Sequence, residues 1–113
     1  MAKTNAAFMS GVPELLVLRL LSNKEMYGYE LVRAIKLSTQ DSIKLAEGVV
    51  YPTLHSLEAR GMLRAREVNT VGRARVYYKT TAKGKKRLQS LMNEWDRVSG
   101  GINAALGELY ASS

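Results

Sequence analysis

The chain has 113 residues, which is enough for one small domain with an appended element and too short for two independent cores. Hydrophobic residues make up 46% and charged residues 24%, which excludes a disordered chain, and the lack of cysteine excludes disulfide frameworks and thiolate metal sites. The net charge is +7, and residues 60–87 hold ten basic residues against a single acidic one, Glu67, so a local surface for a polyanion is indicated.

The location expected for the chain follows from its lack of long apolar runs. The first nine residues carry one charge and no apolar run of secretory length. No later stretch approaches the roughly 20 apolar residues that a membrane span requires. We therefore expect no export and no membrane partner, and with no cysteine present we expect a cytoplasmic protein.

The first 37 residues show two helical segments. Residues 12–21 predict a mostly buried helix, with Ser10 as its N-cap. Residues 27–37 predict a second helix, and its apolar face holds Leu31, Ala34 and Ile35. Gly28 is unusual inside a helix and indicates close packing near the start of that helix.

A polar connection follows at residues 38–46. Ile43 and Leu45 alternate with polar residues there, as in a short strand. The connection is longer than the three or four residues of a minimal helix-turn-helix, so a winged-helix variant is favoured.

The third predicted helix spans residues 47–60 and ends at Gly61. Apolar residues at steps of four and three predict a buried stripe of Val50, Leu54 and Leu57. Short polar side chains lie outside that stripe, namely Thr53, His55 and Ser56. Pro52 must lie within or just past the first turn, because deeper in the helix it would remove a hydrogen bond and kink the axis.

After Gly61 the periodicity changes from helical to alternating, which predicts a β-hairpin. The alternation runs through residues 63–68 and 73–79, on either side of a turn at residues 69–72. It places basic side chains on one face of the hairpin. Like charges on one face repel unless something negative faces them, so Arg73 and Arg75 are expected to bind phosphate rather than to be ordinary solvated charges.

From Thr81, a good N-cap, the chain returns to a helical pattern that continues almost to its end. Apolar residues recur at steps of four and three from Leu88 to Leu109, a heptad seam that needs a partner helix. We predict a dimer interface made of Leu88, Leu91, Met92, Trp95, Val98, Ile102 and Leu106. Gly100 and Gly101 weaken the helix by about 1 kcal/mol each, so a kink or a frayed end is also compatible with the sequence.

The order of these elements, three helices, a hairpin and a long helix, predicts a winged helix-turn-helix with a dimerisation arm. The fold class is mainly α with a small β-hairpin wing (α+β). Residues 1–80 are predicted to form the DNA-binding domain and residues 81–113 the C-terminal dimerisation helix. In such a domain the third helix reads base edges in the major groove and the basic hairpin grips phosphates.

Four ordered motifs also carry a family resemblance. They are YGYE at residues 27–30, EGVVYPTLHSLEARG at 47–61, GRARVYY at 72–78 and TAKG at 81–84. In this order and spacing they resemble the successive signatures of the PadR family of transcriptional regulators, over roughly residues 12–99. The resemblance implies a dimer that represses nearby genes and leaves its operator when a small effector binds or conditions change.

The resemblance also implies roles for individual residues. In the family motif the Tyr-Pro pair opens the recognition helix and the Gly-Arg stretch forms the wing tip, which correspond here to Tyr51 and Pro52 and to Arg73 and Arg75. The single C-terminal helix with Trp95 near its middle is similar to the compact, multidrug-sensing branch of the family. There a tryptophan from each subunit stacks on flat aromatic ligands at the dimer interface, so Trp95 is the effector-binding residue that the resemblance implies.

Two positions depart from the family pattern. Gly100 and Gly101 are able to reshape or shorten the interface helix, which bears on the predicted ligand pore. Thr80 stands where the pattern prefers leucine, which concerns packing more than function.

The predicted DNA-contacting set combines the third helix with the hairpin: Tyr51, Pro52, Thr53, His55, Ser56, Arg73, Arg75 and Tyr77. Tyr51 is also compatible with a place in the core, and His55, the one histidine of the chain, with an ordinary surface position. Trp95 packs on the dimer seam whether or not it also binds an effector.

Together these residues predict a sequence-specific regulator, a repressor that binds a pseudo-palindromic DNA operator as a homodimer and is released by a small planar aromatic or phenolic effector. The alternative is a dimeric small-molecule-binding or interaction module whose DNA binding is weak or nonspecific. Catalysis, a metal and a cofactor are not expected, because the sequence has no cysteine nucleophile, no second histidine, no phosphate loop and no metal-ligand cluster.

Overall fold

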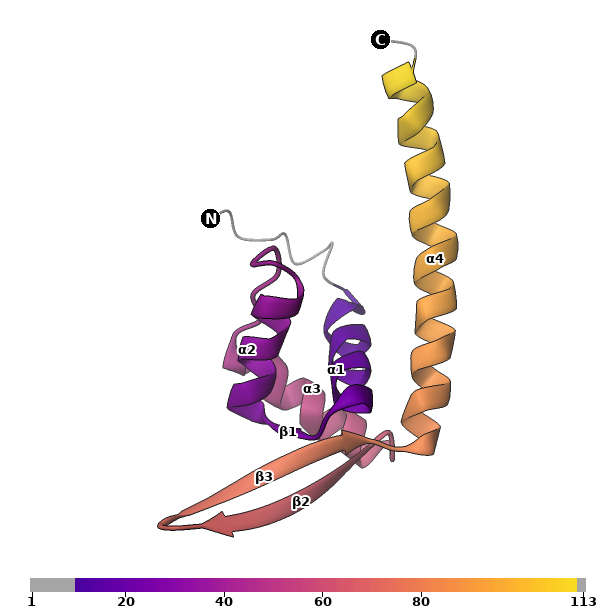
Figure 1. Ribbon diagram of the computed structural model, residues 1–113. Helices are drawn as coiled ribbons and strands as arrows, with labels where there is room; N and C mark the ends of the chain where they lie inside the picture. Colours follow the sequence, from indigo (N-terminus) through magenta and orange to yellow (C-terminus); the bar gives the residue numbers. More distant parts are fainter. Residues whose placement is uncertain (1–9, 112–113) are drawn as a thin grey trace.

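The computed structural model describes residues 10–111, with side chains through Gly107, and Figure 1 shows the arrangement of its elements. The helices are α1 (Val12–Asn23), α2 (Gly28–Ser38), α3 (Glu47–Ala59) and α4 (Ala82–Ala111), and the strands are β1 (Met26–Tyr27), β2 (Leu63–Thr70) and β3 (Arg73–Thr80). The predicted α+β class is confirmed. The first nine residues, where no secretory run is expected, and the side chain of Leu109 lie outside the described part.

The core lies between α1, α2, α3 and the base of the hairpin. Fully buried apolar side chains from the three helices form its centre: Val17, Leu18, Leu21, Leu31, Ile35, Val50, Leu54 and Leu57. The stripe predicted for the third helix is therefore confirmed, and each such side chain contributes roughly 1.5–3 kcal/mol on burial. Thr80 is buried beside them, where its hydroxyl donates to the carbonyl of Leu18 at 2.9 Å. That hydrogen bond satisfies a polar side chain in an apolar setting.

Both early helices begin differently from prediction. α1 is capped by Gly11 rather than Ser10, because Gly11 makes the turn into the helix with a φ of 82° and no side-chain cap is present. The second helix begins at Gly28 rather than Tyr27, because Tyr27 is part of β1. The close packing predicted at Gly28 is confirmed: a Cβ there would lie 2.5 Å from the ring of Tyr51.

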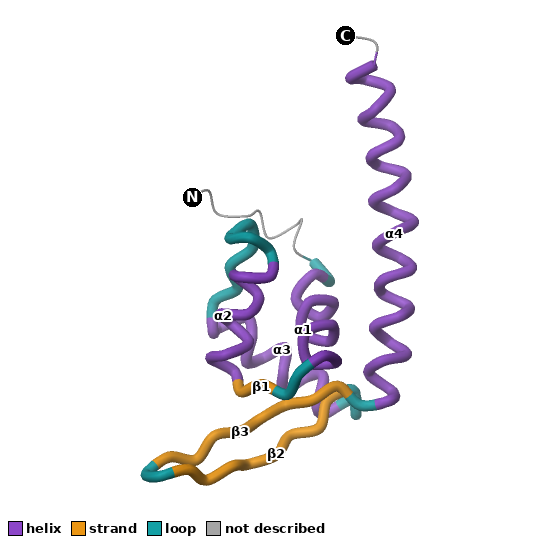
Figure 2. Tube along the Cα trace, in the orientation of Figure 1, coloured by secondary structure: helices purple, strands orange, loops and turns teal. Residues whose placement is uncertain are grey.

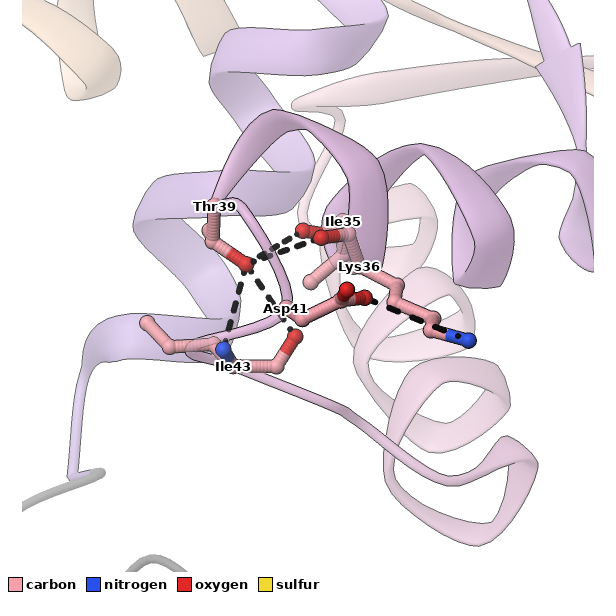
Figure 3. Close-up of polar contacts among 5 residues, drawn as sticks. All are labelled: Ile35, Lys36, Thr39, Asp41 and Ile43. Carbon is pink, nitrogen blue, oxygen red and sulfur yellow. Dashed lines mark hydrogen bonds and ion pairs between the residues drawn. The ribbon is translucent and has the colours of Figure 1, made fainter. Parts of the chain in front are cut away.

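The connection between α2 and α3 is a loop, and the strand predicted at Ile43 and Leu45 is wrong. The Thr39 hydroxyl donates to the carbonyl of Ile35 at 2.7 Å and accepts the N–H of Ile43 at 3.1 Å, which folds the chain back on the end of α2 (Figure 3). The two residues after Thr39 hold left-handed φ values of 54° and 64°. Leu45 is buried in the core instead of pairing with a strand.

The sheet has a third strand that the sequence did not predict. β1 pairs antiparallel with β3, so the strand order is β1-β3-β2. Met26 lies opposite Tyr78 and Tyr27 lies opposite Tyr77. This short strand ties the hairpin to the start of α2.

The hairpin is longer and its turn tighter than predicted. β2 and β3 pair from Leu63 opposite Thr80 to Thr70 opposite Arg73. The turn is therefore two residues rather than four, and its Gly72 has a φ of 74°, which glycine adopts without steric cost. Figure 2 shows the hairpin extending away from the helices.

α4 starts on the core and then runs clear of it (Figures 1 and 2). Thr81 is confirmed as its N-cap, because the Thr81 hydroxyl accepts the N–H of Gly84 at 3.1 Å. Leu88 is buried, whereas side chains farther along the helix are mostly exposed. The helix is unbroken through Gly100 and Gly101 and continues to Ala111. Despite its 30 residues, α4 is not apolar enough to cross a bilayer, and none of the other described helices is either.

Candidate nucleic-acid interface

The hairpin carries a face of basic side chains. Residues opposite each other in an antiparallel pair share a face, and the register therefore gathers five basic residues on one side. They are Arg64, Arg66, Arg73, Arg75 and Lys79, which we call the basic face. The other side carries Leu63, Tyr78 and Thr80, all buried at the base of the hairpin. One side of the hairpin thus packs on the core and the other presents positive charge.

Arg75 is held over an aromatic ring. Its guanidinium carbon lies 4.5 Å from the ring centre of Tyr27, within the range of a cation–π contact. Tyr27 is itself fixed, because its N–H donates to the Glu30 carboxylate at 3.3 Å and its ring meets that of Tyr77 edge-on at 5.4 Å. Arg75 is therefore oriented by a neutral group and keeps its full charge. Arg73 is exposed beside the turn.

Arg66 is held by a carboxylate instead. Its Nε donates to Oε2 of Glu25 at 3.2 Å, and its Nη2 donates to the other oxygen of the same carboxylate. These hydrogen bonds from Arg66 lower the pKa of the Glu25 carboxyl below its ordinary value. The guanidinium of Arg66 also lies 5.8 Å from the ring centre of Tyr77. The basic face therefore contains one arginine whose charge is already paired.

Two further arginines of the basic segment are paired within the chain. Arg60 Nη1 and Arg87 Nε each lie 3.2 Å from the same carboxylate oxygen of Glu14 in α1. Among the described residues, the salt bridges involve no other member of the basic face than Arg66. Arg64, Arg73, Arg75 and Lys79 of the basic face are therefore left for a partner, together with the exposed Lys83, Lys85 and Lys86 at the start of α4.

A hollow of about 300 Å³ separates α3 from the hairpin. It is lined by Tyr27, Gly28, Tyr51, His55, Ala74, Arg75, Val76 and Tyr78. The structure therefore brings three of the predicted site residues together here, Tyr51, His55 and Arg75. Tyr51 is half-buried over Gly28, a position between the core and the open surface, and the exposed His55 has its ring centre 6.4 Å from that of Tyr51.

The other predicted residues of α3 occupy its outer side. Pro52 and Ser56 are exposed, whereas the Thr53 hydroxyl donates to the Val49 carbonyl of its own helix at 2.8 Å. Pro52 is the sixth residue of α3, so the Tyr-Pro pair does not open the helix as the family motif implies. The Gly48 carbonyl consequently has no N–H partner at Pro52, and its exposure lets water satisfy it.

The predicted dimer seam on α4 divides into two parts. Leu88 is buried in the core of its own chain, and Leu91 and Met92 pack partly against that core. Leu88 is therefore a core residue and not, as predicted, part of the dimer seam, because the first turns of α4 cover α1. Beyond them the apolar side chains are exposed, at 55% for Trp95, 40% for Val98, 54% for Ile102 and 42% for Leu106. We call these four residues the apolar face of α4.

Trp95 also lines a second hollow, of about 260 Å³, between α1 and α4. Most of its lining is apolar, with Val12 and Leu15 from α1 and Leu91 and Val98 from α4. Among the described residues that line it, Glu94 is the one that carries a charge. An apolar, concave surface with an exposed indole suits a flat hydrophobic ligand better than an ion.

Sequence reasoning missed the residues that hold the two arginines in place, Tyr27 and Glu25. Both lie in or beside β1, and a two-residue strand has too few positions to show a period. The places of Arg64, Arg66 and Lys79 on the basic face could have been predicted, because the alternation across the hairpin places them with Arg73 and Arg75 once the register is known.

Most of the chain matches a single family of known proteins. The profile of the transcriptional regulator PadR-like family matches residues 17–90, which span α1 to the start of α4. The transcriptional regulator Rv3488 of Mycobacterium tuberculosis is 31% identical over 81 residues, 72% of this chain and 73% of its own length. The transcriptional regulator YqjI of Escherichia coli is 38% identical over 60 residues, but these make up only 29% of its length.

Proteins of known structure share the architecture. A PadR-like transcriptional regulator from Bacillus cereus, BC4206, is 29% identical with a TM-score of 0.75, covering 88% of this chain and 96% of its own. A transcriptional regulator from Clostridium thermocellum has a TM-score of 0.82 at 24% identity, over 90% of this chain and 97% of its own. The predicted winged-helix fold with a long C-terminal helix is confirmed.

Proposed function

Because the chain belongs to the PadR-like family of transcriptional regulators, we propose that it is a sequence-specific repressor that binds a pseudo-palindromic operator as a homodimer and is released by a small planar effector. The observation that carries this proposal is that Arg75 of the basic face and the exposed His55 of α3 line one hollow. The family and the fold are those of transcriptional regulators that act through DNA. The repressing role, the operator, the dimer and the effector go beyond the family and are what we propose.

On DNA, α3 enters the major groove and the hairpin reaches past the adjacent strand. Pro52, His55 and Ser56 are the exposed side chains of α3 that face base edges, and Thr53 contributes through its methyl group since its hydroxyl is used within the helix. The hollow between α3 and the hairpin then lies over the phosphates that separate the two grooves. Tyr51, Arg73, Arg75 and Tyr77 contact that backbone and set the register of the protein on it.

The dimer forms through α4. Its apolar face, from Trp95 to Leu106, is exposed in the single chain and matches the heptad pattern of a helix that packs on a second copy. We therefore assign DNA binding to residues 1–80 and dimerisation to residues 81–113, with the first turns of α4 also serving the core. A two-fold dimer pairs two half-sites about one helical turn of DNA apart, in the cytoplasm where the genome lies.

Fluorescence anisotropy tests this proposal directly. The purified protein is titrated into a labelled duplex from its own promoter region and into a scrambled duplex of equal length, at several salt concentrations. We expect tighter binding to the promoter duplex, and affinity that falls steeply with salt because phosphate contacts release counterions. Equal affinity for both duplexes would remove the claim of specificity.

A second candidate function is favoured by the exposed Trp95 beside its apolar hollow. In that case the chain is a dimeric small-molecule-binding module whose DNA binding is weak or nonspecific. Trp95 is the only tryptophan, so its fluorescence reports on this hollow alone. Strong quenching by planar aromatic or phenolic compounds without binding to the promoter duplex would favour this second function, whereas quenching that coincides with release of the duplex supports the first.

A further inference from the structure

Two arginines of the basic face are held by different kinds of group. Arg75 lies over the neutral ring of Tyr27, and Arg66 forms a two-pronged ion pair with Glu25. The two arginines share one face of the hairpin, so DNA that approaches this face can reach both. Because Arg66 is paired with a carboxylate and Arg75 is not, Arg66 offers less positive charge to a partner than Arg75 does.

The Glu25–Arg66 pair matches the geometry by which arginine binds phosphate. Two N–H groups of the guanidinium meet the two oxygens of one carboxylate, as they would meet two oxygens of a phosphodiester. The side chains are 29% and 60% exposed, so DNA can reach the pair and compete for it. A phosphate can therefore take this two-pronged Nε/Nη2 edge of Arg66 only by displacing Glu25.

Glu25 lies on the same side of the sheet as the basic face. It directly precedes β1 and lies on the side of the sheet that Tyr27 and Tyr77 share with Arg66. The pKa of its carboxyl is lowered first by the hydrogen bonds from Arg66 and also by the charge of Lys79. Glu67, the acidic residue of β2, lies on the opposite face of the hairpin, opposite Val76.

We propose that Glu25 is a built-in competitor of DNA phosphate for Arg66, which removes one phosphate contact from the sequence-independent part of DNA binding. This inference rests on the proposed function. Nonspecific affinity comes almost wholly from phosphate contacts, so a carboxylate that occupies one arginine lowers affinity for every duplex. Because this contact is lost equally on the operator and on other DNA, the pair weakens all binding and its salt dependence, while the preference that the α3 base contacts give the operator stays unchanged.

The variant Glu25→Gln tests the proposal by a gain of binding, which loss of folding cannot imitate. We measure binding to a duplex selected from a random pool by the wild-type protein, and to a scrambled duplex, across a salt series. The plot of log affinity against log salt should steepen by about 0.9 on both duplexes, and affinity at low salt should rise by about threefold to tenfold. The double variant Glu25→Gln with Arg66→Gln should lose this gain.

Glu67→Gln is the matched control, because it makes the same change in net charge on the opposite face of β2, the strand that carries Arg66. We expect it to leave the salt slope unchanged. Arg66→Gln alone should lower the slope much less than Arg75→Gln, since Arg66 is already paired in the unbound protein. These results together would support the competitor role.

Two results would overturn it. One is a salt slope for Glu25→Gln equal to that for Glu67→Gln, and the other is an Arg66→Gln variant that binds as poorly as Arg75→Gln. Failure of the wild-type protein to bind any duplex would overturn the proposed function, and this inference with it. Normal wild-type binding with an unresponsive Glu25→Gln would overturn this inference alone.

Discussion

The hairpin and the distal half of α4 both project from the same small core, yet they expose opposite chemistry (Figure 1). The hairpin presents five basic side chains on a sheet braced by β1. Beyond its first turns, α4 presents the apolar side chains of Trp95, Val98, Ile102 and Leu106, each about half exposed. A charged face needs a negative partner and an apolar face needs an apolar one, so the proposed contact with DNA and the proposed contact with a second copy fall on different parts of the molecule.

The two regions also differ in how they are held in shape. On the hairpin, aromatic and acidic neighbours orient individual arginines before any partner arrives. On α4 the backbone hydrogen bonds of the helix supply the order, over a length of about 45 Å at roughly 1.5 Å per residue. Binding through the hairpin should therefore depend on salt and on single charges, whereas association through α4 should depend on buried area.

The largest effect is expected from a charge placed on the apolar face of α4. Ile102→Glu should weaken dimerisation by at least about 100-fold, because an unpaired charge buried at an interface costs roughly 3–5 kcal/mol. Promoter binding should fall with it. Sedimentation equilibrium measures the dimer, and Ala104→Glu, with the same charge at an exposed position away from the seam, is the control that should stay dimeric.

Removal of charge from the basic face should have the next largest effect. Arg73→Ala with Arg75→Ala should weaken binding to all duplexes by about 10- to 100-fold and reduce the salt slope by about 1.8, for two lost phosphate contacts. Dimerisation should be unaffected. The pair Arg19→Ala and Arg97→Ala removes the same charge from α1 and α4, and an equal loss in that control would contradict the assignment of the hairpin.

A smaller effect should follow when Arg75 loses its orienting ring. Tyr27→Leu should reduce DNA affinity by about two- to fivefold, the equivalent of an exposed cation–π contact, while the salt slope stays near the wild-type value because Arg75 keeps its charge. Anisotropy under the same salt series measures both quantities. Tyr27→Phe retains the ring and should bind like the wild type, so equal losses in the two variants would refute this role.

The smallest expected effect concerns the dependence of stability on pH. The folded-state pKa of Glu25 is lowered by Arg66, so the pair stabilises the fold above the ordinary carboxyl pKa, and this contribution is lost as the pH falls through the lowered pKa. The difference in Tm between wild type and Glu25→Gln should therefore be present at neutral pH and vanish in acid. Thermal unfolding across the acidic range checks this, and Arg66→Gln should abolish the difference.

Elements with a long periodic pattern could be predicted, and short or irregular ones could not. The stripe of Val50, Leu54 and Leu57 follows from helical spacing, and the basic face follows from alternation along the hairpin. Ile43 and Leu45 alternate as well, but Thr39 bonds the chain into a loop there. Three or four residues give too little pattern to separate a strand from a loop, and β1 gives even less.

By itself the sequence determined the order of the elements, the concentration of positive charge in residues 60–87 and the heptad pattern of the last helix, because each is a property of neighbours along the chain. Only the tertiary structure decided that Glu25 takes Arg66, that Tyr27 holds Arg75 and that Leu88 belongs to the core. The first two contacts join residues about 40 or more positions apart through the pairing of β1, β2 and β3. Distances across such a sheet depend on register and packing, which no local pattern of residues records.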